Sequence, residues 1–428
     1  MSGTLKAVRG TRDLLPLETA LWNRIEETAR RVFARYNFGE IRTPVFEDTS
    51  LFARSVGEET DIVSKEMYTW EDRARAASEK SQSLTLRPEN TAGVVRAYIE
   101  HKLGETGQLQ KLYYIGPQFR RERPQKGRYR QFSQIGAEVI GPPSAGSESP
   151  LRDAEVLEML ATLLDELEIA GWTLDINSVG SAADRARFND VLRAALADVA
   201  PKMCGDCQRR AVTNPLRVLD CKVPEDQPYI DALPKMADSL DEDSKAHFAA
   251  VMAALDAAGV PYTRNHRLVR GLDYYTRTTF EFTHGGLGAQ NALLGGGRYD
   301  GLSEAIGGPK APGIGFAMGE DRLVLTLRSL ESAPPQLADA YIAPLGEQMN
   351  APALKLAREL RRAGLTIELG DGSFRLKKSF EAADKTARRI VILGEDEMKS
   401  GILTVKTFAT GDQTNVPHAE LARVISSK

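Results

Sequence analysis

Two segments of alternating polar and apolar residues, 112–120 and 131–140, constrain the fold more than any other feature of the sequence. Side chains on a strand point alternately to two faces, so Phe132, Gln134 and Glu138 share one face of the second segment, and the opposite face is apolar. The apolar face can pack against helices. We therefore predict an antiparallel hairpin with a long loop, whose polar face presents a ring, an amide and a carboxylate.

The loop of this hairpin is rich in arginine and reads Arg120-Arg121-Glu122-Arg123-Pro124-Gln125-Lys126-Gly127-Arg128-Tyr129-Arg130. A dense set of charges is most often a solvated loop on an ordinary hairpin. Guanidinium groups also bind phosphate in a forked geometry, and here they adjoin the polar strand face. The loop is therefore a candidate phosphate site.

A second candidate for anion binding is the apolar segment 313–319, which leads into a helix with Arg322 in its first turn. A cation at that position opposes the helix dipole, at a cost of about a few tenths of a kcal/mol or more. An anionic ligand would remove the conflict. Taken alone, the segment is equally consistent with an arginine that reaches solvent.

Residues 268–275, Leu-Val-Arg-Gly-Leu-Asp-Tyr-Tyr, and 295–301, Gly-Gly-Gly-Arg-Tyr-Asp-Gly, lie between these motifs. Glycines let a backbone approach a ligand closely, although most such runs are flexible turns. The glycine run lacks the Lys-Ser/Thr ending of a P-loop and the spacing of a dinucleotide fingerprint. Neither a P-loop ATPase nor a dehydrogenase is supported.

The chain of 428 residues is too long for a single core, so more than one domain is expected. Apolar spacing predicts an amphipathic helix over 17–36, and Pro88 suits the start of a second helix over 87–102. A charged helical stretch, 185–262, interrupts the strand-like segments and is predicted to be an insertion in a first domain, 1–330.

A boundary is predicted near residues 329–336, where a Pro-Pro pair breaks a helical pattern. Beyond it, strand-like and helical segments alternate from residue 340 to residue 393. We expect residues 331–428 to form a small α/β domain with a parallel sheet.

The composition favours a cytoplasmic protein without a membrane role. Hydrophobic residues make up 42% of the chain and charged residues 27%, with no apolar run of the roughly 20 residues that a membrane-spanning helix needs. The N-terminus has no stretch like a secretory signal, and only three cysteines are present. Because the net charge is −3, a polyanionic partner must be held by local basic patches.

The motifs resemble those of class II aminoacyl-tRNA synthetases: the arginine-rich hairpin, the strand and helix that carry Arg322, and Leu86-Arg87-Pro88-Glu89-Asn90-Thr91. Residues 270–275 and 295–301, with the opening Val8-Arg9-Gly10-Thr11-Arg12-Asp13, resemble segments specific to histidyl-tRNA synthetases of the bacterial type. The resemblance runs from about residue 6 to the C-terminus. It implies an α/β (α+β) architecture: an antiparallel catalytic sheet flanked by helices, a helical insertion and a C-terminal α/β anticodon-binding domain.

The resemblance implies that ATP binds bent upon the sheet. Arg120 is then expected to contact the α-phosphate, and Phe132 and Arg322 to enclose the adenine ring. Arg123 is implied to contact either the γ-phosphate or the end of the tRNA. The face assignment of Phe132 agrees with this arrangement.

The resemblance also implies a histidine site. The matching positions are Glu89, Thr91 and Gln134 for the α-amino group and Glu138, Tyr275 and Tyr299 for the imidazole, with Tyr274 also in the site. A site that pairs both ring nitrogens rejects isosteres strongly, because its buried polar groups would be left unsatisfied. No editing domain is then needed.

Arg270, together with Arg120, is the expected catalytic residue. By resemblance, Arg270 lies against the α-phosphate and stabilises negative charge as a metal ion does in relatives, while the histidine carboxylate attacks and pyrophosphate leaves. No general base is required because that carboxylate is already ionised. Mg²⁺ is expected with ATP, held mainly through the phosphates, and no organic cofactor is expected.

Cys204 and Cys207 form a C-x2-C pair, and Cys221 follows downstream, which is half of a zinc knuckle by spacing. A fourth ligand is missing, and His247 is the only nearby candidate. The sequence therefore predicts no structural zinc and no other bound protein metal.

The expected partners are L-histidine, ATP, the acceptor end and anticodon of the histidine tRNA, and a second copy of the chain. One rival reading is a paralogue without charging activity, the regulatory subunit of ATP phosphoribosyltransferase. That class typically lacks the C-terminal domain and the ATP-binding arginines, whereas Arg120, Arg270 and Arg322 are all present here. A second rival is a class II synthetase for another amino acid, which residues 270–275 argue against.

Overall fold

The structure is a computed structural model that describes residues 4–57, 60, 62–72, 81–125, 127–287, 291–330 and 337–426. The chain divides into two compact units, Met1–Ser332 and Ala333–Lys428, which are described separately. The Pro-Pro pair on which the predicted boundary rests lies outside the described residues. No helix in the described ranges combines the length and apolarity that crossing a membrane requires.

An eight-stranded sheet in the order β1-β5-β6-β11-β10-β9-β7-β8 forms the centre of the first unit. The strands are β1 (Gly39–Glu40), β5 (Gln110–Phe119), β6 (Gln131–Ile140), β7 (Trp172–Ser178), β8 (Thr263–Arg264), β9 (Thr276–His284), β10 (Ala292–Arg298) and β11 (Gly313–Gly319). The six inner strands are antiparallel to their neighbours, and the short outer strands β1 and β8 run parallel to theirs. The predicted hairpin is confirmed as β5 and β6.

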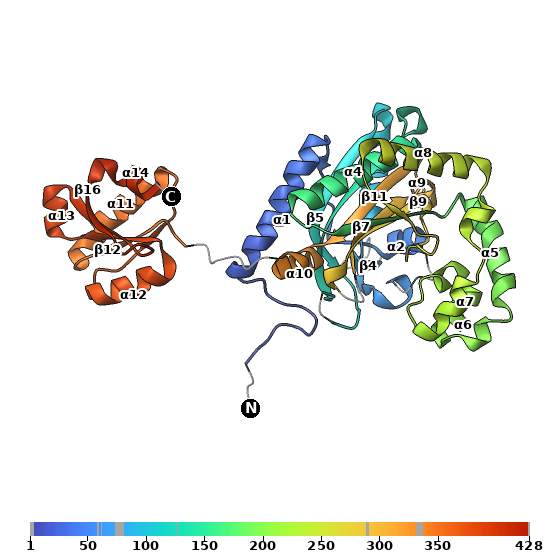
Figure 1. Ribbon diagram of the computed structural model, residues 1–428, viewed down its shortest axis with the longest axis horizontal. Coiled ribbons are helices and arrows are strands. Elements are labelled where there is room, and N and C mark those ends of the chain that lie inside the picture. Colours follow the sequence, from blue (N-terminus) through green and yellow to red (C-terminus); the bar gives the residue numbers. More distant parts are fainter. Residues whose placement is uncertain are drawn as a thin grey trace. The chain divides into compact units, whose positions relative to one another are not determined.

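Helices cover the apolar face of this sheet (Figure 1). They are α1 (Pro16–Arg35), α4 (Pro150–Glu166), α8 (Glu242–Ala258) and α10 (Glu320–Leu330). Their apolar side chains form one buried core with Ile135, Ala137 and Val139 of β6, the apolar face that alternation predicted. The opposite face of β6 is left for the polar residues.

A small sheet in the order β2-β4-β3 adjoins the loop end of the β5–β6 hairpin, where the Phe119 N–H donates to the Arg87 carbonyl oxygen, and short helices pack beside it. These elements are β2 (Phe46–Asp48), β3 (Tyr68–Asp72), β4 (Gln82–Leu86), α2 (Thr49–Val56), α3 (Thr91–Glu100) and α9 (Leu302–Ala305). Helix α3 begins at Thr91, not at Arg87 as predicted. The Glu89 carboxylate accepts the backbone N–H groups of Thr91 (2.7 Å) and Ala92 (3.0 Å), so Glu89 caps the helix from outside it.

The region predicted as an insertion has two packing environments. Helices α5 (Ala182–Leu196), α6 (Gly205–Thr213) and α7 (Gln227–Asp231) gather away from the sheet (Figure 1) and share a core of their own, from Phe188 to Leu240. Helix α8 instead places Phe248, Val251 and Leu255 in the core beneath the main sheet.

The second unit is a five-stranded sheet in the order β13-β12-β14-β15-β16, flanked by helices. Its elements are β12 (Ala340–Pro344), α11 (Asn350–Arg362), β13 (Ile367–Leu369), α12 (Leu376–Thr386), β14 (Arg389–Leu393), α13 (Glu395–Ser400), β15 (Ile402–Thr407), β16 (Gln413–Pro417) and α14 (Leu421–Ser426). Strands β13, β12 and β14 are parallel, as predicted. The sheet is mixed, however, because β15 and β16 form an antiparallel hairpin whose turn contains Gly411 at φ 78°.

Candidate functional site

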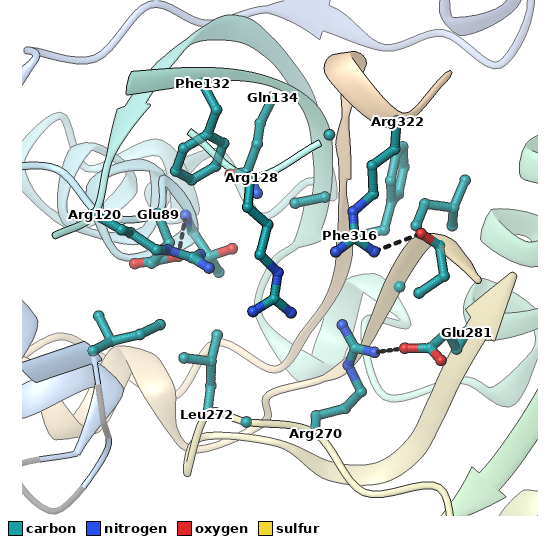
Figure 2. Close-up of a pocket in the computed structure, with 18 of the residues that line it drawn as sticks. Glu89, Arg120, Arg128, Phe132, Gln134, Arg270, Leu272, Glu281, Phe316 and Arg322 are labelled. Atoms are coloured by element: carbon teal, nitrogen blue, oxygen red, sulfur yellow. Dashed lines mark hydrogen bonds and ion pairs between the residues drawn. The ribbon is translucent and has the colours of Figure 1, made fainter. Parts of the chain in front are cut away.

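A pocket of about 540 Å³ opens on the polar face of the main sheet in the first unit (Figure 2). Sequence-predicted residues from five separate segments line it: Glu89, Thr91, Arg120, Phe132, Gln134, Arg270, Tyr274, Tyr275 and Arg322. A volume of this size lies in the range typical of small-molecule sites. The antiparallel pairing of β6 with β11, and of β11 with β10, brings these distant segments together.

Arg120 and Phe132 stand at facing ends of the hairpin, where Gln118 pairs with Phe132 and Phe119 with Gln131. The Arg120 Nε atom donates to the Pro88 carbonyl oxygen (2.9 Å), and its guanidinium carbon lies 5.2 Å from the centre of the Phe132 ring. The side chain is thus fixed by backbone and ring while its outer nitrogens remain at the pocket.

Arg322 reaches into the pocket from the start of α10, and its Nη1 donates to the Ala292 carbonyl oxygen (2.7 Å). Burial lowers the pKa of Arg322, and the like charges of Arg128 and Arg120 lower it further. Cations that repel one another in a partly buried pocket favour a ligand that carries several negative charges. A triphosphate has that character.

Arg270 faces these cations from the opposite wall, in the loop before β9 (Figure 2). Its Nη1 donates to Glu281 Oε2 at 2.5 Å. Burial alone would lower the pKa of Arg270, but Tyr275 and Glu281 raise it. A Cβ atom at Gly295 would lie 2.6 Å from Arg270 Nη1, so a larger residue there would displace the guanidinium from its place above β10.

The inner end of the pocket is built around Glu138, which is completely buried. Thr91 Oγ1 donates to Glu138 Oε1, and the Tyr299 hydroxyl donates to Oε2, each at 2.7 Å. Glu138 and Tyr299 do not line the pocket themselves, and they stand directly behind the residues that do. Above them, the rings of Tyr274 and Tyr275 lie 4.7 Å apart, centre to centre.

Burial raises the pKa of Glu138 to about 8, although hydrogen bonds from Thr91 and Tyr299 act against the shift. Near neutral pH the carboxyl group can therefore hold a proton or release it to a basic ligand. Gly315 on β11 is paired with Glu138, and a Cβ atom there would lie 1.7 Å from Oε2. The carboxyl group occupies the space of the missing side chain.

Two acceptors flank this inner end. Gln134 Oε1 is buried and has no hydrogen-bond partner within the described part of the chain. Glu89 is buried, and burial raises its pKa, although backbone N–H groups act against the shift. Such acceptors suit an ammonium group, which would satisfy both.

The comparisons with known proteins agree along the whole chain. The family described as "Histidyl-tRNA synthetase" matches residues 10–323, and the family described as "Anticodon binding domain" matches residues 339–428. A histidine–tRNA ligase of Koribacter versatilis is 72% identical over 98% of this chain and 95% of its own, and one of Solibacter usitatus is 56% identical over 98% of each. The crystal structure of apo histidyl-tRNA synthetase from S. aureus is 37% identical, with a TM-score of 0.80, and covers 99% of this chain and 100% of its own.

The chain belongs to the histidyl-tRNA synthetase family. Its architecture, a largely antiparallel sheet flanked by helices with a C-terminal α/β unit, agrees with the architecture that the resemblance implied.

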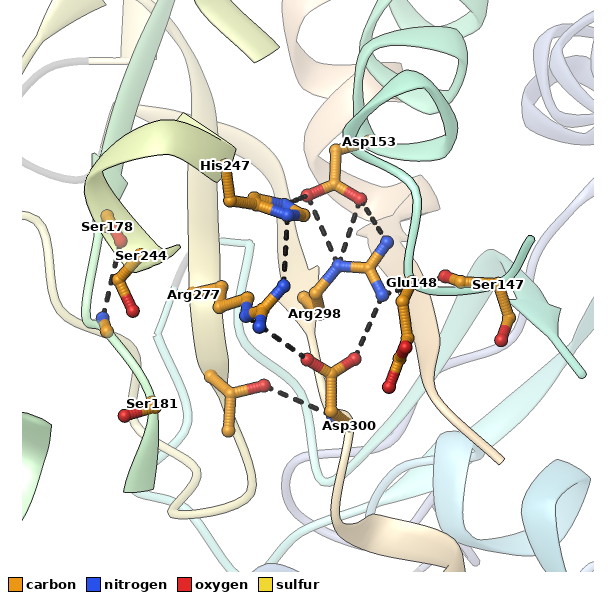
Figure 3. Close-up of polar contacts among 12 residues, drawn as sticks. Ser147, Glu148, Asp153, Ser178, Ser181, Ser244, His247, Arg277, Arg298 and Asp300 are labelled. Carbon is orange, nitrogen blue, oxygen red and sulfur yellow. Dashed lines mark hydrogen bonds and ion pairs between the residues drawn. The ribbon is translucent and has the colours of Figure 1, made fainter. Parts of the chain in front are cut away.

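The glycine run that resembled this family is a buried strand, β10, and not a flexible turn. Arg298 at its end is fully buried and pairs with Asp153 and Asp300 (Figure 3). His247 of α8 bonds to Asp153 (2.9 Å) on one side and to Arg277 (3.2 Å) on the other. Although burial alone would raise it, the charge of Arg298 lowers the pKa of Asp153 to about 2.

This network is a support rather than part of the pocket. Arg298 and Asp300 flank Tyr299, so their ion pairs fix the backbone from which the Tyr299 hydroxyl reaches Glu138. His247 was the only nearby candidate for a fourth zinc ligand beside the cysteines. In the structure it bonds to Asp153 and Arg277 of this network instead.

Arg123 is exposed and, unlike the other predicted arginines, does not line the pocket. Arg128 of the predicted phosphate-binding loop lines the pocket, and several lining residues were not predicted: Tyr114, Arg210, Arg217, Asp220 and Glu281. Cross-strand register could have found Tyr114, because it pairs with Gly136 on the polar face of the hairpin. The insertion residues Arg210, Arg217 and Asp220 carry no local signal, since only long-range packing brings them to the pocket.

Proposed function

We propose that this chain is a histidine–tRNA ligase whose active site is the pocket of Figure 2. In the first step a histidine carboxylate oxygen attacks the α-phosphorus of ATP, the bond between this phosphorus and the α,β-bridging oxygen breaks, and pyrophosphate leaves with that oxygen. In the second step a ribose hydroxyl at the 3′ end of the tRNA attacks the histidyl carbonyl, and AMP leaves. The observation that carries the proposal is a row of arginines leading to a buried carboxyl group beneath tyrosines.

The outer pocket is the proposed ATP site. Phe132 and Arg322 enclose the adenine ring, and Arg120 binds the α-phosphate. Arg270 meets the same phosphate from the opposite wall and stabilises the charge that develops during attack. Because Glu281 holds the Arg270 guanidinium at 2.5 Å, the cation is oriented before the substrates arrive. We retain Arg123 as a contact for either the γ-phosphate or the tRNA end, in keeping with its exposed place in the loop.

The inner pocket is the proposed histidine site. Gln134, Glu89 and Thr91 surround the α-ammonium group, and the open acceptor of Gln134 supports this assignment. One side of the imidazole is assigned to Glu138 and Tyr299, which stand directly behind the lining and which the ring must reach at the inner end, and Tyr274 and Tyr275 cover the ring. A carboxyl group with a pKa of about 8 can exchange a proton with an imidazole, whose own pKa is near neutrality.

We propose that Mg²⁺ accompanies ATP and is held mainly through phosphate oxygens. The donor set of the outer pocket fits this arrangement: Glu281 is paired with Arg270, and Glu122 with Arg128 at 3.2 Å, so both carboxylates already have cationic partners. Bound to the phosphates, the ion would neutralise charge on the leaving pyrophosphate.

The second unit, residues 339–428 of which match an anticodon-binding domain, is proposed to grip the anticodon of the histidine tRNA. We also propose that residues 185–262 form the insertion and that the chain works in the cytoplasm as a homodimer. Light scattering tests the last point, because a homodimer has twice the 46.9 kDa mass of one chain.

Pyrophosphate exchange into ATP, measured with each amino acid in turn, tests the proposal. Histidine alone should support exchange. Exchange with proline or threonine but not histidine would identify a synthetase for another amino acid. The regulatory-subunit alternative predicts no exchange at all, and full-length relatives named histidine–tRNA ligase make it the weaker candidate.

A further inference from the structure

Three cysteines and one carboxylate converge inside the insertion core. Cys204 precedes α6, Cys207 lies in its first turn, and Cys221 follows the short helical turn Pro215–Val218. Asp226 ends the next turn, Pro224–Asp226. Cys207, Cys221 and Asp226 are buried, and Cys204 is partly exposed.

The four ligand atoms stand close enough together to surround a single ion. All four lie within 4.8 Å of one another. The Sγ atoms of Cys204 and Cys221 are 3.9 Å apart, and Cys221 Sγ is 3.3 Å from Asp226 Oδ2. In a tetrahedral zinc site these separations are about 3.8 Å between two sulfurs and about 3.5 Å between sulfur and oxygen.

Backbone donors around the cluster suit negatively charged ligands. The Cys207 N–H points at Cys204 Sγ (3.5 Å), and the Val223 N–H points at Cys221 Sγ (3.4 Å). The Cys204 N–H donates to Asp226 Oδ1 (3.0 Å). Donors of this kind orient ligands and lower the cost of holding them deprotonated.

We propose that Cys204, Cys207, Cys221 and Asp226 bind one structural zinc ion. The sequence predicted no zinc because the C-x2-C pair and Cys221 lacked a fourth ligand. Asp226 fills that place, five residues after Cys221, while His247 is held by Asp153 and Arg277. Three thiolates and a carboxylate around a closed site are the ligand chemistry of zinc, and not of magnesium or calcium.

The ion would brace one wall of the catalytic pocket. Arg210 lies three residues after Cys207 on α6, and Asp220 directly precedes Cys221; both line the pocket. The charge of Asp220 acts on Arg270 and helps to raise its pKa. Between the ligands, Asn214 Nδ2 donates to Asp273 Oδ1 (2.9 Å) and so joins the insertion to the loop that carries Arg270.

Metal analysis of the full-length protein, purified under reducing conditions from zinc-supplemented cells, tests the site without substrate. We expect about one zinc ion per chain. Cobalt substitution should give the intense visible and sulfur-to-metal bands of a four-coordinate thiolate site. Because these measurements need no ATP, histidine or tRNA, they can fail or succeed independently of the proposed ligase activity.

Variants at the fourth ligand make the test specific. Asp226→Asn keeps an oxygen acceptor for the Cys204 N–H but loses the charged ligand, and should weaken zinc binding at least about tenfold in a chelator competition. Asp226→Cys completes a four-thiolate site and should restore or tighten binding. Asp206→Asn changes an exposed carboxylate on α6, between Cys204 and Cys207; it is the matched control and should bind zinc like the parent.

A last measurement asks whether the zinc ion stabilises the wall of the catalytic pocket or is bound without effect on it. Removal of zinc by a chelator should lower both the thermal unfolding temperature and the adenylation rate of the parent, and added zinc should restore them. Zinc content near that of a buffer blank would overturn the proposal. Equal zinc binding by the parent, Asp226→Asn and Cys204→Ser would also overturn it. A disulfide between Cys204 and Cys221 that is found although reductant was present throughout purification would do the same.

Discussion

At the scale of single residues, the site depends on one cation held in place by a partner, Arg270, and on one carboxyl group whose pKa lies far above its ordinary value, Glu138. Arg270 keeps its proton with the help of Glu281, and Glu138 keeps one because it is buried. Each is oriented by a short contact to a neighbour, Arg270 to Glu281 and Glu138 to Thr91 and Tyr299. Both can therefore be tested by substitutions that change charge and leave most of the packing in place.

Replacing Arg270 by alanine should slow adenylation by roughly a hundredfold to a thousandfold, because a preorganised contact to the developing phosphate charge is lost. The KM for histidine should change little. Single-turnover adenylate formation separates the two effects. Arg264→Ala, an exposed arginine on β8, is the matched control and should react at the parental rate; an unchanged rate in the Arg270 variant would remove Arg270 from the mechanism.

Glu138 should make the protein less stable as pH rises. Its pKa is about 8 when folded and near its usual 4.5 when unfolded, so the folded state binds the extra proton between those values. Its contribution to stability is fully present below pH 4.5 and is lost as pH rises through about 8.

Denaturant unfolding from pH 5 to pH 8.5 should therefore show a steeper fall in unfolding free energy for the parent than for Glu138→Gln, by an amount of the order of a few kcal/mol. Glu320, whose pKa burial also raises to about 8, is common to both proteins and cancels in the comparison. Parallel curves for the two proteins would contradict the raised pKa. Glu105→Gln, on the exposed surface, should follow the parent.

At the scale of elements, glycines on two paired strands shape the site as much as its polar residues do. Gly315 on β11 makes room for Glu138, and Gly295 on β10 makes room for Arg270. On β10, Gly297 lies next to Tyr275, whose ring carbon would be 2.8 Å from an added Cβ atom. The side chains of Glu138, Arg270 and Tyr275 thus pack directly against the glycine backbone of these strands.

Gly315→Ala should abolish histidine activation while ATP binding survives, because the new methyl group displaces the Glu138 carboxyl group at the inner end only. Pyrophosphate exchange and nucleotide titration measure the two properties. Gly301→Ala adds a methyl group that meets nothing within 4 Å and should behave like the parent. Full exchange activity in Gly315→Ala would show that Glu138 can move without loss.

Local periodicity predicted those elements whose packing is decided by their own side chains. The faces of β6, the helix α1 and the alternating strands of the second unit were predicted correctly, because period and burial agree there. The strand at 295–297 was not predicted, since glycines carry no alternation. Its strand character comes from its neighbours β9 and β11.

Within the site, strand alternation placed Phe132, Gln134 and Glu138 on one face of β6, whereas Arg120 and Arg322 were expected at the site because their motifs resemble those of the family. Asp226 could not be assigned as the fourth partner of the cysteines, since the turns between residues 213 and 227 decide where it lies. The same holds for the pairing of Arg270 with Glu281, which depends on how the loop before β9 folds back.

At the scale of the whole molecule, the proposed catalysis and the proposed tRNA recognition fall in two units that each have their own core. The first unit contains the pocket and its supporting network, and the second has a separate buried core from Ala340 to Ile425. A unit with its own core is able to fold independently.

A chain ending at residue 332 should therefore keep much of its histidine-dependent pyrophosphate exchange and lose tRNA charging. The pocket is intact in such a chain, but the unit proposed to bind the anticodon is absent. Exchange and charging assays on the same preparation give the comparison. Circular dichroism should be used to check that the shortened chain is folded. Equal loss of both activities in a folded protein would contradict this division of labour.

The three glycines of β10 also bear on how this gene can vary. Every missense change in a glycine codon adds at least a Cβ atom, which would lie within 3 Å of Arg270 at position 295, of the β11 backbone at 296 and of the Thr278 carbonyl oxygen at 297. At 296 and 297 the added atom meets backbone, which cannot give way cheaply, whereas at 295 it meets the end of the Arg270 side chain, which must move. A saturation library should therefore exclude substitutions most strongly at codons 296 and 297, and the codon for Gly301, four positions further on, should accept many residues.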